Sequence, residues 1–251
     1  EDRRRYARVV VFAAAGGDLG VHALLHDRGL GRGQRVLSLA CGRGDELLLA
    51  LRRFDVAAAV GVERDPAAAA RARQWLHGAG LDRRAGVVTA GVLESALDPA
   101  LRAAIGGDFD AVLCVDAAYH LSPRTAFLEA AAGWLRPGGR LAFTDLVLDA
   151  APRGSMRLRA AAALCGVPHG DLVAAEARVQ QLQAAGYRDV QCRRLDDAVL
   201  GGFARFVRRQ RRVLGRDAWR RAWWPAAVTA ALIGPSRAAG LGYALFSARR
   251  P

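Results

Sequence analysis

Between Gln34 and Leu148 the sequence alternates short apolar runs with amphipathic segments, and this alternation constrains the fold more than any other feature. Five apolar runs have the length and residue types of buried strands: RVLSLA (35–40), VAAAVGVE (56–63), AGVVTAGV (85–92), FDAVLCVDA (109–117) and RLAFTDLVL (140–148). Four segments between them have helical patterning: 45–54, 65–80, 98–106 and 122–139. The alternation predicts a parallel sheet with helices on both faces, whose ligands bind at the carboxyl ends of the strands.

The regular alternation of strand and helix patterns ends after Leu148. Residues 149–182 and 196–240 are expected to be largely helical, and a strand is expected between them at Gly186–Leu195. The sequence GLGYALFSARR (240–250) predicts a last strand. A long helical insertion therefore separates the last two strands.

The charge balance does not identify a nucleic-acid partner. The formal net charge is +13, but the chain contains no lysine and its arginines are spread along the whole sequence. Net charge alone indicates non-specific attraction, so we expect no nucleic-acid ligand. The cysteines form no CxxC pair, and no histidine has metal-ligand spacing, so we expect no metal. Cys41, Cys114 and Cys192 sit in or beside apolar runs, which predicts buried, reduced thiols.

No targeting or membrane-spanning segment is evident. The chain has no run of about 18 uncharged apolar residues, which a transmembrane helix would need. Residues 1–8 do not resemble a signal peptide. These features predict a cytoplasmic protein, and whether a targeting segment was removed before Glu1 stays open.

The turn CGRG (41–44), between the first expected strand and the first helix, is the strongest local signal for a bound cofactor. A dinucleotide site requires GxGxxG and an acid about 20 residues further on. Gly42, Gly44 and Glu63 satisfy part of this pattern, but Leu47 stands at the third glycine position. Leu47 and the lack of any Tyr-xxx-Lys pair weaken the alternative of an NAD(P)-dependent oxidoreductase.

Motifs in a fixed order resemble the class I S-adenosylmethionine-dependent methyltransferases, in their small-molecule (methyltransferase type 11-like) branch. VLSLACGRG (36–44) resembles the first motif, VLDxGCGxG, and AVGVERDP (59–66) resembles the motif of the second strand. DFDAVLCVDAAYHLSPRTAFLEAAAGWLRPGGRLAFTDLVL (108–148) resembles the stretch FD-x-V through PGG-x-L of that branch. The resemblance implies an α/β, Rossmann-like doubly wound sheet, mostly parallel with an antiparallel last strand, and S-adenosyl-L-methionine as the cofactor.

Two departures from the family motifs keep a non-catalytic, cofactor-binding scaffold open as an alternative. In the first motif Ser38 replaces the aspartate and Ala40 replaces the first glycine. The third strand ends in Gly91-Val92-Leu93, where the family usually has Gly-Asp-Ala. The family aspartate binds the adenine amino group, so here a backbone amide of Val92 or packing of Leu93 would have to serve.

The resemblance also implies the cofactor contacts. The backbone of the turn would approach the methionine part, Glu63 would bind the ribose hydroxyls and Arg64 would pack on the adenine. Val115 and Asp116 would face the amino group of the cofactor. The full expected set is Ala40, Cys41, Gly42, Gly44, Glu63, Arg64, Val92, Leu93, Val115 and Asp116.

The methylated atom, O, N or C, stays open, and we favour O-methylation. A hydroxyl acceptor would need a base near the transferred methyl group. His120 lies just past the fourth strand, and histidine is the side chain best suited to accept a proton near neutral pH. Asp145, at the end of the fifth strand, would orient His120 or hold the acceptor. Tyr119 and Arg124 are expected to line the acceptor pocket.

The segments outside the core are expected to select the acceptor. We expect residues 1–33 to form a helical segment over the active site, 34–148 the cofactor-binding core, and 149–251 the rest of the sheet with lid insertions at 149–182 and 196–240. Arginines alternate with aromatic residues across 203–224, which predicts an amphipathic lid or a peripheral membrane contact. An apolar, helix-roofed pocket favours a hydrophobic small molecule, such as a terpenoid, sterol-like, quinone-like or lipid acceptor. A monomer and a homodimer both stay open.

Overall fold

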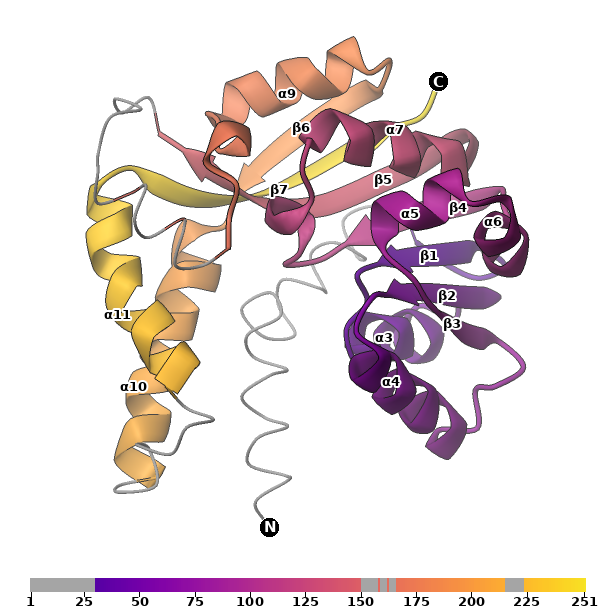
Figure 1. Cartoon of the computed structure of the whole chain (residues 1–251), viewed down its shortest axis with the longest axis horizontal. Coiled ribbons are helices and arrows are strands. Elements are labelled where there is room, and N and C mark those ends of the chain that lie inside the picture. The colour runs from indigo at the N-terminus through magenta and orange to yellow at the C-terminus, as the bar shows by residue number, and fades with distance from the viewer. Residues whose placement is uncertain (1–29, 150–157, 159–161, 163–165, 215–223) are drawn as a thin grey trace.

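The computed structural model describes residues 30–149, 158, 162, 166–214 and 224–251. These residues form a seven-stranded sheet in the order β3-β2-β1-β4-β5-β7-β6 (Figure 1). The strands are β1 (Arg35–Leu39), β2 (Ala58–Glu63), β3 (Ala85–Thr89), β4 (Phe109–Cys114), β5 (Leu135–Leu148), β6 (Arg188–Arg194) and β7 (Leu241–Arg249).

The pairing of the strands confirms the expected doubly wound sheet. β1 lies at its centre and pairs in parallel with β2 and β4, and the parallel ladder continues to β3 on one side and to β5 on the other. The last strand, β7, inserts between β5 and β6 and runs antiparallel to both. The carboxyl ends of β1, β2, β4 and β5 therefore meet along one edge of the sheet, which we call the carboxyl edge.

Helices cover both faces of the sheet. α3 (Asp45–Arg53) and α4 (Pro66–Gly78) lie below it in Figure 1, and α5 (Val92–Leu97), α7 (Arg124–Trp134) and α9 (Ala175–Ala184) lie above it. The remaining short elements are α6 (Pro99–Ile105), η1 (Ala118–His120), η2 (His169–Asp171) and η3 (Asp197–Gly201). Each face has its own core: Leu47 and Leu76 pack on the lower face, whereas Phe127, Trp134 and Phe143 pack on the upper face.

Local sequence explains where two of the helices begin. The Asp65 carboxylate accepts a hydrogen bond from the Ala67 N–H at 2.9 Å, and Pro66 occupies the first helical position of α4, as the sequence predicts. Asp98 and Pro99 repeat this arrangement at α6, where the carboxylate accepts the Ala100 N–H at 2.7 Å.

The expected third strand, 85–92, is too long at its carboxyl end. β3 stops at Thr89 and Val92 is the first residue of α5. Gly91 ends the extended backbone, and its N–H donates to the Glu94 carboxylate at 3.2 Å, which stabilises the start of the helix. The fifth strand differs in the opposite direction, because β5 already begins at Leu135 rather than at Arg140.

One of the cysteine predictions is wrong. Cys41 and Cys114 are buried, as expected, but Cys192 is exposed because β6 is an edge strand with an exposed outer side. Cys165 lies outside the described residues, and so does most of the predicted segment 1–33.

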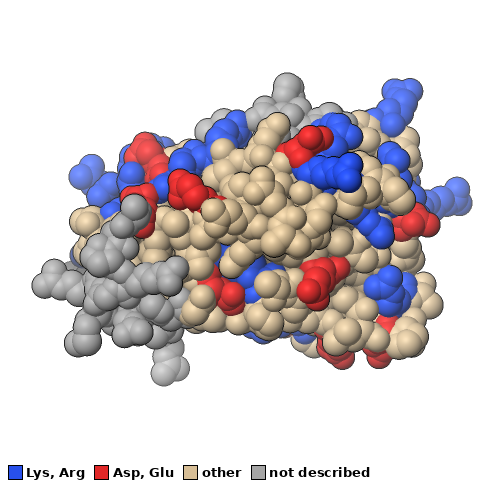
Figure 2. Space-filling view, turned by 90° about the horizontal axis from the view of Figure 1, so that it is seen from above, with Lys and Arg blue, Asp and Glu red and all other residues tan. Residues whose placement is uncertain are grey.

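Figure 2 shows the face of the molecule that α7 and α9 cover. Arginine side chains and carboxylates are mixed on this face around an uncharged centre, and the described residues form no continuous basic stripe there.

The late helical insertion lies beyond the carboxyl edge of the sheet. It consists of η3, α10 (Gly202–Leu214) and α11 (Trp224–Ala238), drawn at the left of Figure 1. The apolar side of α10 packs on α11, whereas Arg208, Arg209 and Arg212 are exposed. No helix within the described ranges is long and apolar enough to cross a membrane. The membrane contact expected from 203–224 stays a prediction, and residues 215–223 of it lie outside the described chain.

Candidate functional site

The glycine-rich turn after β1 forms the first part of the site. Ala40, Gly42 and Gly44 have left-handed backbone angles, with φ of 57°, 55° and 81°. A Cβ at Gly42 would meet no atom within 4 Å, so the turn is open on that side. β2 packs closely beneath it, because a Cβ at Gly61 would lie only 2.5 Å from the Cys41 sulfur. The sequence therefore builds a tight glycine turn at the carboxyl edge, with open space beside Gly42.

Glu63, the last residue of β2, connects the turn to the neighbouring strand. Its Oε2 accepts the Gly42 N–H at 2.8 Å and its Oε1 accepts the Asp65 N–H at 2.8 Å. Only 8% of Glu63 is exposed. Each carboxylate oxygen keeps a further lone pair, so the group can still accept hydrogen bonds from a ribose diol.

The other expected adenosine contacts lie around this carboxylate. Arg64 is exposed beside Glu63, and Leu93 is half-buried in the first turn of α5. Val92 is buried and belongs to the apolar core of the upper face. The Val92 side chain therefore serves the core, and only its backbone is left for a contact with the adenine.

Asp116 lies at the centre of a hydrogen-bond network after β4. Its Oδ1 accepts the hydroxyl groups of Tyr119 at 2.7 Å and Tyr243 at 3.0 Å. The Tyr243 hydroxyl oxygen in turn accepts the Thr144 hydroxyl at 2.7 Å, and Thr144 Oγ1 accepts the Asp116 N–H at 2.7 Å. Burial raises the pKa of Asp116 to about 6, against the opposing effect of the two tyrosine hydrogen bonds. Val115, just before it, is buried.

The helical insertion packs directly against this network. Val199, Leu200, Ala204 and Ile233 form an apolar cluster with Tyr243, and Tyr119 and Phe203 pack against the cluster. The described insertion therefore places apolar side chains beside the carboxyl edge, as expected for a roof over a hydrophobic ligand.

His120 has the geometry of a proton acceptor. Its Nδ1 lies 3.1 Å from the Gly166 carbonyl oxygen, and its ring makes an edge contact with Tyr119 at 4.5 Å between centroids. A carbonyl oxygen can only accept, so Nδ1 carries the proton and the neutral ring has its lone pair on Nε2. The side chain is exposed, which leaves Nε2 accessible to a ligand.

Asp145 does not lie with His120. Asp145 is fully buried, and its carboxylate accepts Arg124 Nε at 3.0 Å and pairs with Arg178 Nε at 3.1 Å. Arg124 is buried as well and also donates to the Ala118 and Leu121 carbonyl oxygens. This buried ion-pair group holds η1 and α7 against β5. In this arrangement the Asp145 carboxylate is engaged by two arginines rather than by His120, and the Arg124 guanidinium is engaged by Asp145 and by backbone carbonyl oxygens.

Three residues at or near the carboxyl edge were not among the site residues predicted from the sequence. Tyr243 and Arg178 reach the network and the ion-pair group from residues far along the chain, and no local motif marks them. The third is Glu46, which is 6% exposed and accepts the Ser38 hydroxyl at 2.6 Å. Burial raises the pKa of Glu46 to about 7.

Glu46 gives the stability of the protein a defined pH dependence. A carboxyl group with a raised pKa in the folded state binds its proton more tightly there than in the unfolded chain. The free energy of unfolding therefore falls as the pH rises from about 4 to 8, by up to about 3 kcal/mol for this group. We expect Glu46→Gln to remove at least about half of the fall measured by urea denaturation. The exposed Glu129→Gln should leave it unchanged, and an unaltered pH dependence in Glu46→Gln would contradict the assignment.

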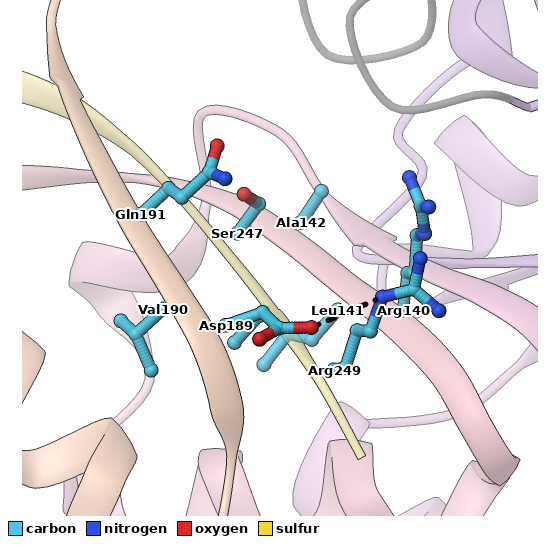
Figure 3. A pocket seen from close by; sticks show the side chains of 9 residues that line it. Arg140, Leu141, Ala142, Asp189, Val190, Gln191, Ser247 and Arg249 are labelled. Carbon is cyan, nitrogen blue, oxygen red and sulfur yellow. Dashed lines mark ion pairs between the residues drawn. The ribbon is translucent and has the colours of Figure 1, made fainter.

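A separate hollow lies at the opposite end of the strands. Figure 3 shows this pocket of about 480 Å³, which β5, β6 and β7 line with residues that include Arg140, Gln191 and Ser247. An ion pair between Asp189 and Arg249, at 3.4 Å, crosses it. Its lining comes from the amino ends of β5 and β6, so it is not part of the carboxyl-edge site. The described residues contain no group of three or more potential metal ligands.

Comparison with known proteins assigns the family. A family model described as a methyltransferase domain matches residues 3–192, which is more than half of the chain. The fold is similar to that of phosphoethanolamine N-methyltransferase 2 of Haemonchus contortus, solved with phosphomonomethylethanolamine and S-adenosylhomocysteine. The TM-score is 0.81 at 16% identity, and the match covers 100% of this chain and 57% of the other. The chain belongs to the S-adenosylmethionine-dependent class I methyltransferases, and the cofactor of this family is S-adenosylmethionine.

Two curated relatives share parts of the sequence. Erythromycin 3''-O-methyltransferase of Saccharopolyspora erythraea is 34% identical over 99 residues, which cover 37% of this chain and 32% of the relative. The 27-O-demethylrifamycin SV methyltransferase of Amycolatopsis mediterranei is 30% identical over 122 residues, covering 49% of this chain and 42% of the relative. The matches thus span less than half the length of either relative.

Proposed function

We propose that this protein transfers a methyl group from S-adenosylmethionine to a hydroxyl oxygen of a hydrophobic small molecule. The acceptor class is a natural product of terpenoid, sterol-like, quinone-like or lipid character. The observation that carries the proposal is the exposed His120 ring, whose Nδ1 is held by the Gly166 carbonyl oxygen while Nε2 keeps its lone pair.

The residues at the carboxyl edge fit the cofactor. The open space at Gly42 leaves room for the methionine part, and Glu63 at the end of β2 has lone pairs for the ribose. When bound, S-adenosylmethionine supplies a methyl group on a positively charged sulfur. The protein has to align the acceptor oxygen with that methyl group and to exclude water.

His120 would supply the proton transfer. When the acceptor oxygen takes the methyl group and the carbon–sulfur bond of the cofactor breaks, Nε2 of His120 would take the proton that the oxygen loses. The imidazolium would be stabilised by the Nδ1–H···O=C bond to Gly166. Asp116 would remain bound to its two tyrosines and would keep Tyr119 against the histidine ring.

The apolar cluster of the insertion supports a hydrophobic acceptor. Leu200, Phe203 and Ile233 meet Tyr119 and Tyr243 beside the expected acceptor position. The names of the two curated relatives give erythromycin and 27-O-demethylrifamycin SV as their substrates, and both names specify an oxygen position. These relatives support an oxygen acceptor on a small molecule.

Substitution of His120 tests the proposal. We expect His120→Gln to lower turnover by at least about 100-fold, because a general base contributes 10²–10⁴-fold. The affinity for S-adenosylmethionine should change by less than about twofold, since the glycine turn and Glu63 are untouched. The measurement is transfer of a labelled methyl group to a panel of hydroxyl-bearing hydrophobic compounds, with calorimetric titration of the cofactor beside it. His77→Gln is the matched control. His77 is an exposed histidine on α4, and its Nδ1 lies 2.9 Å from the Asp82 carboxylate.

The same experiment distinguishes the alternative of a non-catalytic, cofactor-binding scaffold. That alternative rests on the departures at Ser38 and Val92 from the family motifs. It predicts cofactor binding without methyl transfer to any compound of the panel. Transfer at an unchanged rate in His120→Gln would instead remove His120 from the base role.

A further inference from the structure

The carboxylate of Glu46 is buried beside the cofactor turn, and no basic side chain in the described part of the chain forms an ion pair with it. It lies in the first turn of α3, two residues after the turn ends at Gly44, and only 6% of the residue is exposed. Its Oε1 accepts the Ser38 hydroxyl at 2.6 Å. None of the ion pairs among the described residues reaches it. Burying an unpaired carboxylate costs several kcal/mol, so a purely structural role would be better served by an amide or an apolar side chain.

The surroundings of Glu46 increase this cost. The charged groups that act on its carboxylate most strongly are Asp45 and Glu63, both negative. The thiols of Cys41 and Cys114 are also near enough for Glu46 to raise their pKa values. The two thiols stay protonated and uncharged, so the negative groups around the glycine turn are the carboxylates of Asp45, Glu46 and Glu63.

The arginines of the same region are engaged elsewhere. Arg43 lies 3.6 Å from the Asp45 carboxylate, and Arg73 donates to the Val87 carbonyl oxygen at 2.9 Å. Neither is among the groups that act most strongly on Glu46. Within the described part of the chain, the Glu46 carboxylate is thus left without a basic partner, and a cationic ligand could balance its charge.

Ser38 and Glu46 together also account for the departure from the first family motif. The motif has an aspartate on the strand where this chain has Ser38, which is fully buried. Here the carboxylate comes from the helix instead and reaches the strand through the Ser38 hydroxyl. A negative charge is thereby kept beside β1 although the motif residue is lost.

We propose that Glu46 is the residue that balances the positive charge of S-adenosylmethionine at the turn, and so makes the protein prefer this cofactor to its neutral product. S-adenosylmethionine carries one more positive charge than S-adenosylhomocysteine, on the sulfur that loses the methyl group. In a site of low dielectric a charge at short range contributes strongly to binding. The inference rests on the cofactor of the family and does not depend on the acceptor or on His120.

A proton on Glu46 competes with the cationic cofactor. The ionised carboxylate binds S-adenosylmethionine better, whereas S-adenosylhomocysteine gains much less from the ionisation. Since the pKa of Glu46 lies at about 7, the ionised fraction rises about tenfold between pH 6 and pH 8. The affinity for S-adenosylmethionine should rise with it.

Calorimetric titration of both compounds between pH 6 and pH 8 tests the proposal. In the unmodified protein we expect the Kd of S-adenosylmethionine to fall by up to about tenfold and that of S-adenosylhomocysteine to change by less than about twofold. In Glu46→Gln we expect the pH dependence to disappear and the preference for S-adenosylmethionine to drop by at least about fivefold. Retained binding of S-adenosylhomocysteine shows that this variant is folded, and Glu129→Gln, at an exposed glutamate of α7, should behave as the unmodified protein.

Ser38→Ala tests the same proposal if Glu46→Gln does not fold. Ser38→Ala keeps the carboxylate but removes the hydroxyl that stabilises its ionised form, so the pH midpoint of S-adenosylmethionine binding should move upward. An unchanged preference and pH dependence in Glu46→Gln, or equal pH dependence for both compounds in the unmodified protein, would overturn the proposal.

Discussion

Asp145→Ala is expected to destabilise the protein by about 3–5 kcal/mol, the largest effect of any substitution considered for this fold. Asp145 is fully buried and its carboxylate binds Arg124 Nε at 3.0 Å and Arg178 Nε at 3.1 Å. Alanine would leave two buried guanidinium groups without their anion, which costs more than the pair itself contributes. Urea denaturation at neutral pH measures the effect.

A matched control separates burial from ion pairing as such. Asp149 pairs with Arg194 at 2.7 Å, but its side chain is 54% exposed. Asp149→Ala should therefore cost less than about 1 kcal/mol. A cost as small for Asp145→Ala would show that the ion-pair group does not hold η1 and α7 in place.

Glu63→Ala is expected to weaken S-adenosylmethionine binding by at least about 100-fold. Hydrogen bonds to a charged group contribute about 1.5–3 kcal/mol each, and the carboxylate is expected to bind two ribose hydroxyls. The substitution also removes the acceptor of the Gly42 N–H, which loosens the glycine turn. Calorimetric titration measures the loss.

The conservative variant Glu63→Gln is the control for Glu63→Ala. Glu63→Gln keeps one amide oxygen for the Gly42 N–H but loses the second acceptor and the charge, so its affinity should fall between those of the alanine variant and the unmodified protein. Equal affinity in all three proteins would place the adenosine elsewhere.

Patterns within short windows made most of the fold predictable. The strand and helix alternation predicted β1 to β5 and helices α3, α4, α6 and α7 in the right order but missed α5, and Asp65-Pro66 marked the start of α4. The predicted third strand was too long because Gly91 ends β3 through its contact with Glu94. That contact is local, and Glu94 three residues after Gly91 was a signal that could have been used.

The side-chain network at the carboxyl edge was not predictable in the same way. Tyr243 meets Asp116 across 127 residues of sequence, and Arg178 reaches Asp145 from α9. The register of β7 on β5 places Tyr243, and the packing of α9 on the sheet places Arg178; a single sequence contains neither arrangement.

The burial of Asp145 could have been predicted from its position in the strand. Its position near the end of β5 suggested chemistry, but alternation along the strand places it on the same face as Leu141, Phe143 and Val147, all of them fully buried. The alternation itself therefore indicated a buried partner for Asp145, and the two arginines provide it.

Titration of the unmodified protein with S-adenosylmethionine, S-adenosylhomocysteine and NADH tests the central claim most directly, namely that the turn at 41–44 and Glu63 form an S-adenosylmethionine site. The arrangement of Gly42, Gly44 and Glu63 predicts saturable, micromolar binding of both adenosyl compounds and none of NADH. Binding of NADH, or of none of the three, would contradict it.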